Sequence, residues 1–290
     1  MAGPILVKQL KTALLEAAAE ISDLNMDVVV HESIDSTNSW SLQQVRSGKA
    51  LPFACFAEEQ TSGRGRRGKL WVMSAHSNIA MSLTWPFVSS YQQLHLLPLS
   101  IAVAIAETLE NLKLQQIQIK WPNDVYVQGK KIAGILIDAR PLKKKQVDAG
   151  PEDIKQMAVV IGVGLNYDMT ALKFDDSQIL PVFTDICDQF ESQLIDVKPD
   201  RASVAIALLQ QVVNVCQNFE RDSKQYLEKF RRHYDFCKDK NVEIITDDKQ
   251  VLAGIARGVN DNAELLVLIE GQEYVFNSAE VSVKTGLESL

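Results

Sequence analysis

The sequence lacks the signals of disulfide-rich, metal-binding and membrane-spanning proteins. Only four of its 290 residues are cysteine, widely separated and without a C-x-x-C pair, and the four histidines form no ligand pair at helical spacing. Scattered cysteines are typical of a reduced protein in which thiols fill small apolar spaces. The most apolar stretch, LLPLSIAVAIA at 96–106, is far shorter than the roughly 20 residues that cross a bilayer. We therefore expect a cytoplasmic protein that does not span a membrane.

An excess of basic residues is also absent. The net charge is −7, whereas a protein with a broad nucleic-acid-binding surface is usually basic. Near the N-terminus, Lys8, Lys11 and Glu16 interrupt the apolar run of a possible signal peptide, so the spacing predicts an amphipathic helix over 5–22. With 46% hydrophobic and 23% charged residues, the composition is that of a globular protein with a sizeable core.

The chain divides into two regions with different periodicity. Up to residue 236, apolar strands alternate with helical patterns, which predicts an α+β domain with a mixed or antiparallel sheet. Residues 237–290 carry short alternating strands separated by polar turns, which predicts a small β-barrel-like domain. We expect 141–156 to be an exposed loop and 200–233 to form two helices, with a break near Arg221 and Asp222. The predicted strands cover 26–32, 53–59, 78–87, 117–121, 125–128, 131–139 and 157–167, and further helices cover 35–48 and 92–112.

Residues 61–71, TSGRGRRGKLW, match two nucleotide-binding motifs by spacing alone. A dinucleotide-binding loop is followed by a helix and by an acidic residue about 20 positions later, and neither is present here. A phosphate-binding loop of the Walker type needs Ser or Thr after its lysine, and Leu70 occupies that position. What remains is a glycine-rich loop with four cations, which favours a ligand that carries several negative charges. The cations are Arg64, Arg66, Arg67 and Lys69.

Two later segments suggest a sheet surface that lies against a small molecule. In IKWPNDVYVQGKKIAGILID, 119–138, polar side chains at Lys120, Asn123 and Asp124 join two apolar strands. Lys131 opens the next strand and Gly134 lies inside it; glycine within a strand often marks close approach of a ligand or of another backbone. The strand VIGVGLN then places two glycines on one face and ends in a polar residue; these are Gly162, Gly164 and Asn166.

Taken together, DSTN (35–38), EQTSGRGRRGKLW (59–71), KWPNDVYV with KKIAGILID (120–138) and VIGVGLN (160–166) resemble the motif series of biotin protein ligases. The resemblance extends from about Met26 to the last β segment. It implies a catalytic domain like that of class II synthetases, followed by an SH3-like domain. It also implies a two-step reaction, in which biotin and MgATP give biotinyl-5′-AMP and a lysine of a biotin carboxyl carrier domain then accepts the biotinyl group.

The resemblance also assigns roles to residues by position. Lys131, Arg66 and Asp124 would be catalytic, with Asp124 a ligand of Mg²⁺, and Trp71 would pack near the adenine. The expected biotin-binding residues are Ser36, Thr37, Asn38, Gln60, Gly63, Arg64, Gly65, Arg66, Lys131, Gly134, Gly162 and Gly164. The expected ATP- and adenylate-binding residues are Arg66, Arg67, Lys69, Trp71, Asn123 and Asn166.

Two other functions stay open at this point. A lipoate or octanoate ligase would share the sheet and the adenylate chemistry, and a nucleic-acid-binding regulator would use the basic loop on a polyanion. Only 34 residues precede Asp35, too few for an independent domain, so we expect no N-terminal DNA-binding domain. The sequence fits a monomer or a homodimer.

Overall fold

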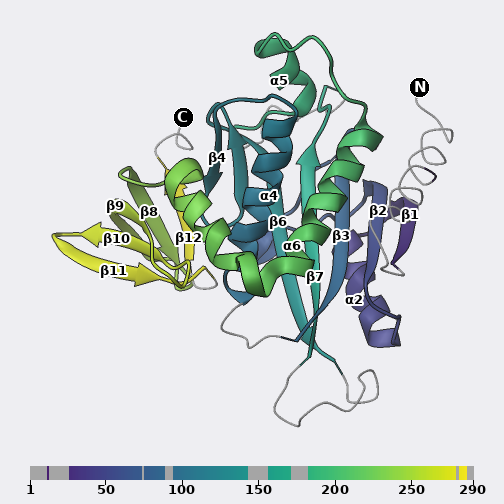
Figure 1. Ribbon diagram of the computed structural model, residues 1–290. Coiled ribbons are helices and arrows are strands. Elements are labelled where there is room, and N and C mark those ends of the chain that lie inside the picture. The colour runs from purple at the N-terminus through teal and green to yellow at the C-terminus, as the bar shows by residue number, and fades with distance from the viewer. Residues whose placement is uncertain are drawn as a thin grey trace.

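Two β-sheets organise the computed structural model of this chain, which describes residues 12, 26–73, 75–88, 94–142, 156–170, 182–278 and 281–285 (Figure 1). The first sheet has seven strands in the order β1-β2-β3-β7-β6-β5-β4. Its first pair, β1 with β2, is parallel, and the other pairs are antiparallel. The strands are β1 Asp27–Ile34, β2 Phe53–Gln60, β3 Asn78–Phe87, β4 Ile117–Lys120, β5 Asp124–Val127, β6 Lys130–Pro141 and β7 Met157–Asn166. The mixed sheet and its strands confirm the expected α+β class.

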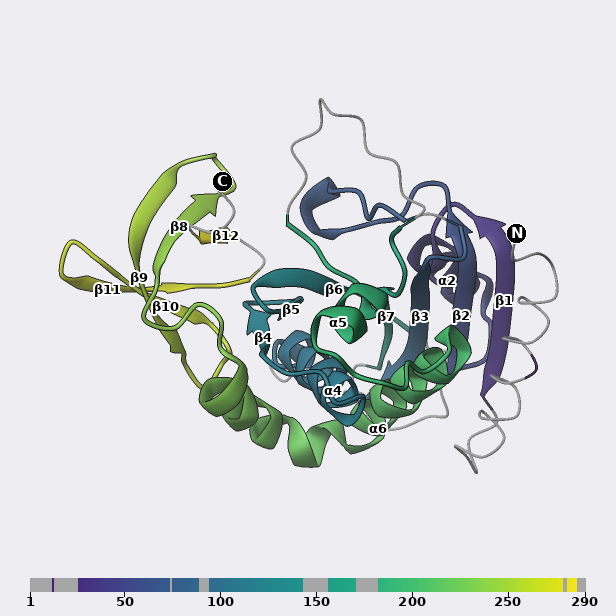
Figure 2. The ribbon, with the colours of Figure 1, turned by 90° about the horizontal axis from the view of Figure 1, so that it is seen from above.

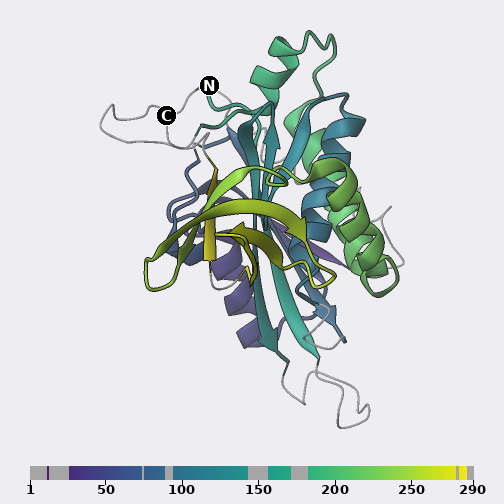
Figure 3. The same cartoon turned by 90° about the vertical axis from the view of Figure 1, so that its left-hand side faces the viewer.

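Helices cover both faces of this sheet. Helices α4 (Leu97–Asn111) and α6 (Arg201–Lys229) pack against each other on one face, and α2 (Thr37–Ser47) lies on the other (Figure 3). The α4 sequence is apolar on nearly every side because it lies between the sheet and α6, with eleven of its residues buried. Helix α2 ends at Gly48, whose φ of 85° is the left-handed conformation that glycine adopts readily at a helix C-terminus. This arrangement leaves the α2 face of the central strands open for a site.

One helix prediction was wrong, and one short helix was missed. Residues 201–229 form one 29-residue helix, continued by a π-helical turn at Phe230–Tyr234, and not two helices. The Arg221 and Asp222 side chains pair with each other on the helix surface, Nε to Oδ1 at 2.7 Å, so two charges there do not interrupt the backbone. A short helix α5, Ile186–Ser192, was not predicted; it is too short to show a clear apolar period.

The second sheet lies beyond the β4 edge of the first (Figure 2). Its five antiparallel strands, in the order β11-β10-β9-β8-β12, confirm the expected C-terminal β region. They are β8 Asn241–Thr246, β9 Val251–Val259, β10 Leu265–Ile269, β11 Gln272–Phe276 and β12 Val281–Thr285. Trp121 donates its indole N–H to the Ala263 carbonyl at 2.8 Å, and the Tyr126 and Phe236 rings stack with centroids 5.1 Å apart. Buried residues of both sheets form one continuous apolar cluster, so the second sheet is firmly attached.

Two further predictions concern segments that are largely outside the described residues. These are the N-terminal helix over 5–22, of which Thr12 is described, and the loop over 141–156. All four cysteines are free and buried, in agreement with their expected role as small apolar side chains. Within the described ranges, none of the helices combines the length and the apolar character needed to cross a membrane.

Candidate functional site: a cavity between the basic loop and two sheets

A cavity of about 880 Å³ opens on the α2 side of the first sheet, between the basic loop (residues 61–71) and the second sheet. Its lining includes all but one of the residues expected in the site: Ser36, Thr37, Asn38, Gln60, Arg64, Gly65, Arg66, Arg67, Lys69, Trp71, Asn123, Asp124, Lys131, Gly134, Gly162, Gly164 and Asn166. Gly63 lies at the base of the loop and instead lines a smaller cavity of about 360 Å³ beside the loop. Segments more than a hundred residues apart therefore meet in one cavity.

The basic loop is a tight hairpin closed by its own backbone. The Gly65 N–H donates to Lys69 O at 2.7 Å, and the Trp71 N–H donates to Gly63 O at 2.9 Å. A Cβ placed on Gly63 would lie 2.5 Å from the Trp71 carbonyl oxygen, and Gly68 has a φ of 74°. At these two positions glycine therefore serves the closure of the loop itself, whereas the sequence suggested that the glycines admit a ligand.

Contacts outside the loop hold two of its arginines, Arg66 and Arg67. Arg66 donates to Asn123 Oδ1 at 3.1 Å and to the backbone carbonyl of Ser278, which follows β11 in the second sheet. Arg67 pairs with Asp247, in the turn between β8 and β9, and adopts a left-handed backbone with φ 54°. The second sheet thus contributes directly to the wall of the cavity, which the sequence did not predict.

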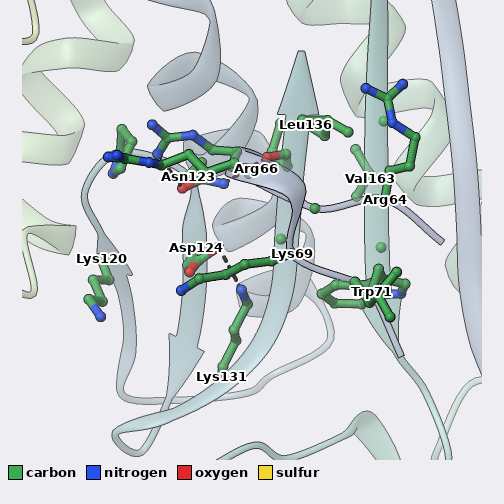
Figure 4. A pocket seen from close by; sticks show the side chains of 18 of the residues that line it. Arg64, Arg66, Lys69, Trp71, Lys120, Asn123, Asp124, Lys131, Leu136 and Val163 are labelled. Carbon is green, nitrogen blue, oxygen red and sulfur yellow. Dashed lines mark hydrogen bonds and ion pairs between the residues drawn. The ribbon is translucent and has the colours of Figure 1, made fainter. Parts of the chain in front are cut away.

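The cationic end of the cavity is organised around Lys131 and Arg66 (Figure 4). Lys131 Nζ lies 2.8 Å from Asp124 Oδ1, and both side chains are about three-quarters buried. Burial lowers the pKa of the Arg66 guanidinium below its ordinary value, partly opposed by the attraction of Asp124. Arginine keeps its charge even so, and a partly desolvated cation interacts strongly with an anion. This end can therefore bind and stabilise phosphate and carboxylate oxygens.

The residues at this end are compatible with a single carboxylate ligand for Mg²⁺. Among the described residues, no group of three or more His, Cys, Asp or Glu side chains is arranged to hold a metal ion. In nucleotide sites, however, Mg²⁺ is commonly held by one or two carboxylates together with substrate phosphates and water. Asp124, in the cavity wall, meets that requirement.

The opposite end of the cavity is neutral, polar and buried. At the start of α2, the Thr37 N–H donates to Gln60 Oε1 at 2.9 Å, and the Thr37 hydroxyl lies 3.2 Å from the same oxygen. Ser82, fully buried in β3, lies 2.7 Å from Thr37 Oγ1 and donates to Asn38 Oδ1 at 2.6 Å. Ser82 was not among the expected residues; a serine between apolar neighbours in a buried strand is the signal that could have identified it. The network fixes several donors and acceptors at this end of the cavity, where they can bind a small polar group.

A strip of three glycines forms the floor between the two ends, but protein side chains cover it. A Cβ on Gly164 would lie 2.4–2.8 Å from the Trp71 indole, and one on Gly134 would lie 3.2 Å from the same ring. A Cβ on Gly162 would lie 2.1 Å from Asn38 Oδ1. We expected the glycines to lie against biotin and Trp71 to pack near the adenine; in this structure the indole lies on the strip itself. Its Nε1 is buried without a hydrogen-bond partner in the described chain, which makes this position costly to the protein.

Two remaining residues are engaged with other parts of the protein. The Asn166 amide accepts a hydrogen bond from Asn78 Nδ2 at 2.9 Å and donates to Thr184 O at 3.0 Å. Lys120 lines the cavity but is only 5% exposed. These two hydrogen bonds indicate that Asn166 fixes the end of β7 against β3 and the segment before α5.

Comparison with known proteins identifies related sequences over most of the chain. Residues 30–150 match the family described as "Biotin/lipoate A/B protein ligase family". The chain is 30% identical over 259 residues to the bifunctional ligase/repressor BirA of Escherichia coli, covering 89% of this chain and 74% of that protein. It is 29% identical over 271 residues to the biotin–[acetyl-CoA-carboxylase] ligase of Mycobacterium tuberculosis, covering 88% of each.

Solved structures share the fold as well. The biotin protein ligase from Aquifex aeolicus in complex with biotin and ATP superimposes with a TM-score of 0.68 at 22% sequence identity. The match covers 90% of this chain and 99% of that one. The arrangement of the two sheets is therefore common to both proteins.

Proposed function

Because this chain belongs to the biotin protein ligase family, we propose that it attaches biotin to a lysine of a carrier protein, with ATP and through biotinyl-5′-AMP. The observation that supports this most directly is one cavity with a cationic end at Lys131 and Arg66 and a neutral polar end at Thr37 and Gln60. Biotin carries a charged carboxylate at one end and a neutral ureido group at the other. A ligand of that kind, together with the phosphates of ATP, fits the distribution of charge in the cavity.

In the first step, a biotin carboxylate oxygen attacks the α-phosphorus of ATP. A C–O–P linkage forms, the bond from the α-phosphorus to the bridging oxygen breaks, and pyrophosphate leaves. The two reacting partners are both anionic, so fixed cations lower their repulsion and stabilise the charge of the transition state. We assign this role to Lys131 and Arg66, whose side chains lie at the same end of the cavity (Figure 4). Asp124 orients Lys131 and would also hold Mg²⁺, which neutralises phosphate charge when it is bound.

In the second step, the amine of the carrier lysine attacks the acyl carbon of biotinyl-5′-AMP. An amide forms, AMP leaves with the electrons of the acyl–phosphate bond, and the amine loses a proton. The basic loop covers the cationic end and would hold the adenylate until the carrier arrives. We propose that Arg67 and Lys69 contact phosphates and that Asn123 supports the loop by holding Arg66.

At the neutral end, we propose that Ser36, Thr37 and Gln60 recognise the ureido group. Thr37 and Ser82 are buried, Gln60 is half-buried, and all three are already oriented by their hydrogen bonds, so little freedom is lost when a ligand binds. The fused rings of biotin would lie on Gly134 and Gly164. They can do so only if the Trp71 indole moves, because the two would occupy the same space.

We further propose the organisation and setting in which this activity operates. Residues 1–236 would form the catalytic domain and 237–290 the SH3-like domain. The carrier would be the biotin carboxyl carrier domain of a biotin-dependent carboxylase. Four free, buried cysteines fit a reducing compartment, and we place the reaction in the cytoplasm.

The test is a streptavidin blot of a carrier domain incubated with the protein, biotin and MgATP. We expect biotinylation that requires all three additions and that disappears when the target lysine of the carrier is replaced by arginine. Pyrophosphate exchange with biotin or with lipoate separates the two ligase activities. Exchange with lipoate alone would contradict the proposal and favour a lipoate ligase.

A further inference from the structure

Asp138, on β6, connects the neutral end of the cavity to the basic loop. Its Oδ2 accepts a hydrogen bond from Asn38 Nδ2 at 3.2 Å and lies 3.4 Å from an Arg64 guanidinium nitrogen. The Asp138 side chain is 19% exposed and the Arg64 side chain 41%. One carboxylate oxygen therefore contacts a residue at the start of α2 and a residue of the loop.

Asn38 is fixed on three sides, and Asp138 defines one of them. Ser82 donates to its amide oxygen at 2.6 Å, and Gly162 lies directly beneath that oxygen. The amide nitrogen faces Asp138 and also donates to Leu136 O at 3.4 Å. With the amide reversed, its oxygen would face a carboxylate, which can only accept, whereas the Ser82 hydroxyl can donate or accept and tolerates either orientation. Asp138 therefore selects the orientation of Asn38 in which the amide nitrogen faces the carboxylate.

Arg64 is held apart from the other cations of the loop. In Figure 4 its side chain points upward on the right of the view, beside Val163, whereas Arg66 and Lys69 extend to the left. Asp138 supplies the charge that keeps it there, and the backbone of Arg64 is bridged to Leu70 across the hairpin. A change at Asp138 would release the Arg64 side chain at one edge of the loop. The contacts of Arg66 and Arg67 at the opposite edge would remain.

We propose that Asp138 is a positioning residue that couples closure of the basic loop to the orientation of Asn38. This inference rests on the proposed function, since it assigns the two coupled elements to the retention of biotinyl-5′-AMP and to biotin binding. Asp138 lines the smaller cavity beside the loop and not the main one, so it acts through Asn38 and Arg64.

Two substitutions separate the two contacts. Asp138→Asn keeps an oxygen that accepts from Asn38 but removes the charge that holds Arg64. We expect the rate of biotinyl-5′-AMP release to rise about tenfold, with the KM for biotin changed less than about threefold. Asp138→Ala removes both contacts, and the KM for biotin should also rise about tenfold. The control is Asp196→Asn, at an exposed aspartate between α5 and α6, which should change neither quantity.

A double-mutant cycle with Arg64→Met distinguishes coupling from a general loss of structure. With Arg64 already replaced, Asp138→Asn should change the release rate less than about twofold. Full, additive effects of the two substitutions would overturn the inference, as would an unchanged release rate in Asp138→Asn. Circular dichroism and thermal melting check that each variant is folded. If Asp138→Ala does not fold, the inference is tested by Asp138→Asn and the double-mutant cycle alone. A wild-type protein that forms no biotinyl-5′-AMP would refute the proposed function itself, whereas an active wild type with unaffected variants refutes only the role of Asp138.

Discussion

The two ends of the cavity are built in different ways. At the α2 end, Thr37, Asn38 and Ser82 are almost completely buried and bonded to one another. At the loop end, Arg67 and Lys69 lie on a solvent-facing hairpin, and Arg67 has its described charged partner in the second sheet. A neutral group can be recognised by donors fixed in advance, because neutral donors and acceptors satisfy one another before a ligand binds. The cations of the loop repel one another. In the absence of an anionic ligand, a protein carboxylate such as Asp247 offsets this repulsion by pairing with Arg67.

The largest expected effect is at the partly buried cation of the loop end. Lys131→Ala should lower the rate of biotinyl-5′-AMP formation by about a hundredfold or more, since removing one fixed electrostatic contact to a transition state typically costs that much. The KM for ATP should change far less. Pyrophosphate exchange measures both. Lys130→Ala is the matched control, because Lys130 is the next residue in the chain and its half-exposed side chain lies near Asp188. A near wild-type rate in Lys131→Ala would contradict the catalytic assignment.

The next effect concerns retention of the intermediate. Arg66→Gly removes the guanidinium group that donates to Asn123 and Ser278 and that we place over the adenylate. Release of biotinyl-5′-AMP should be about tenfold faster or more, given the usual strength of a charge-assisted hydrogen bond. Labelling of bystander proteins in a mixture would report the escape. Arg257→Gly, on β9 and exposed, serves as the control. Equal labelling by the two variants would contradict a role of Arg66 in retaining the adenylate.

A smaller change is expected at the neutral end. Thr37→Val keeps the shape of the side chain but removes the hydroxyl that contacts Gln60 and Ser82. The KM for biotin should rise about tenfold, with kcat nearly unchanged, because the buried Ser82 and the half-buried Gln60 each lose a partner and neither residue lies at the cationic end where the reaction takes place. Steady-state kinetics at saturating ATP measures this. Ser47→Ala, exposed at the far end of α2, should have no effect; a fall in kcat alone for Thr37→Val would argue against ureido recognition.

The smallest effect is expected where the loop meets the second sheet. Asp247→Asn removes the charged partner of Arg67, but 72% of the Asp247 side chain is exposed and exposed pairs contribute little. The KM for ATP should change less than about threefold, and the difference should vanish at high salt. Titration of ATP at low and high salt checks both points. A large, salt-independent loss would mean that the second sheet orders the loop more strongly than an exposed ion pair can.

Much of this protein could be predicted from local pattern. Alternating and continuous apolar runs marked every strand of the first sheet, since each strand buries at least one face. The spacing of cations in the basic loop and the glycines of β6 and β7 indicated a ligand cavity, and nearly all the expected residues line it. The long helix α6 was interpreted as two because surface charges at Arg221 and Asp222 look like a break when the packing of the opposite face is unknown.

Residue types and their spacing were enough to identify the polar residues within apolar strands and the cations between glycines. The fold established which of these residues meet. It placed the Trp71 indole on Gly164, joined Asp138 to both Asn38 and Arg64, and brought Asp247 to Arg67 across 180 residues of chain. Periodicity reports whether one side chain is buried, but a contact between two side chains depends on how the strands and sheets that carry them pack together. For that reason the sequence could identify the residues of the candidate site, whereas the contacts between their side chains could be assigned only from the fold.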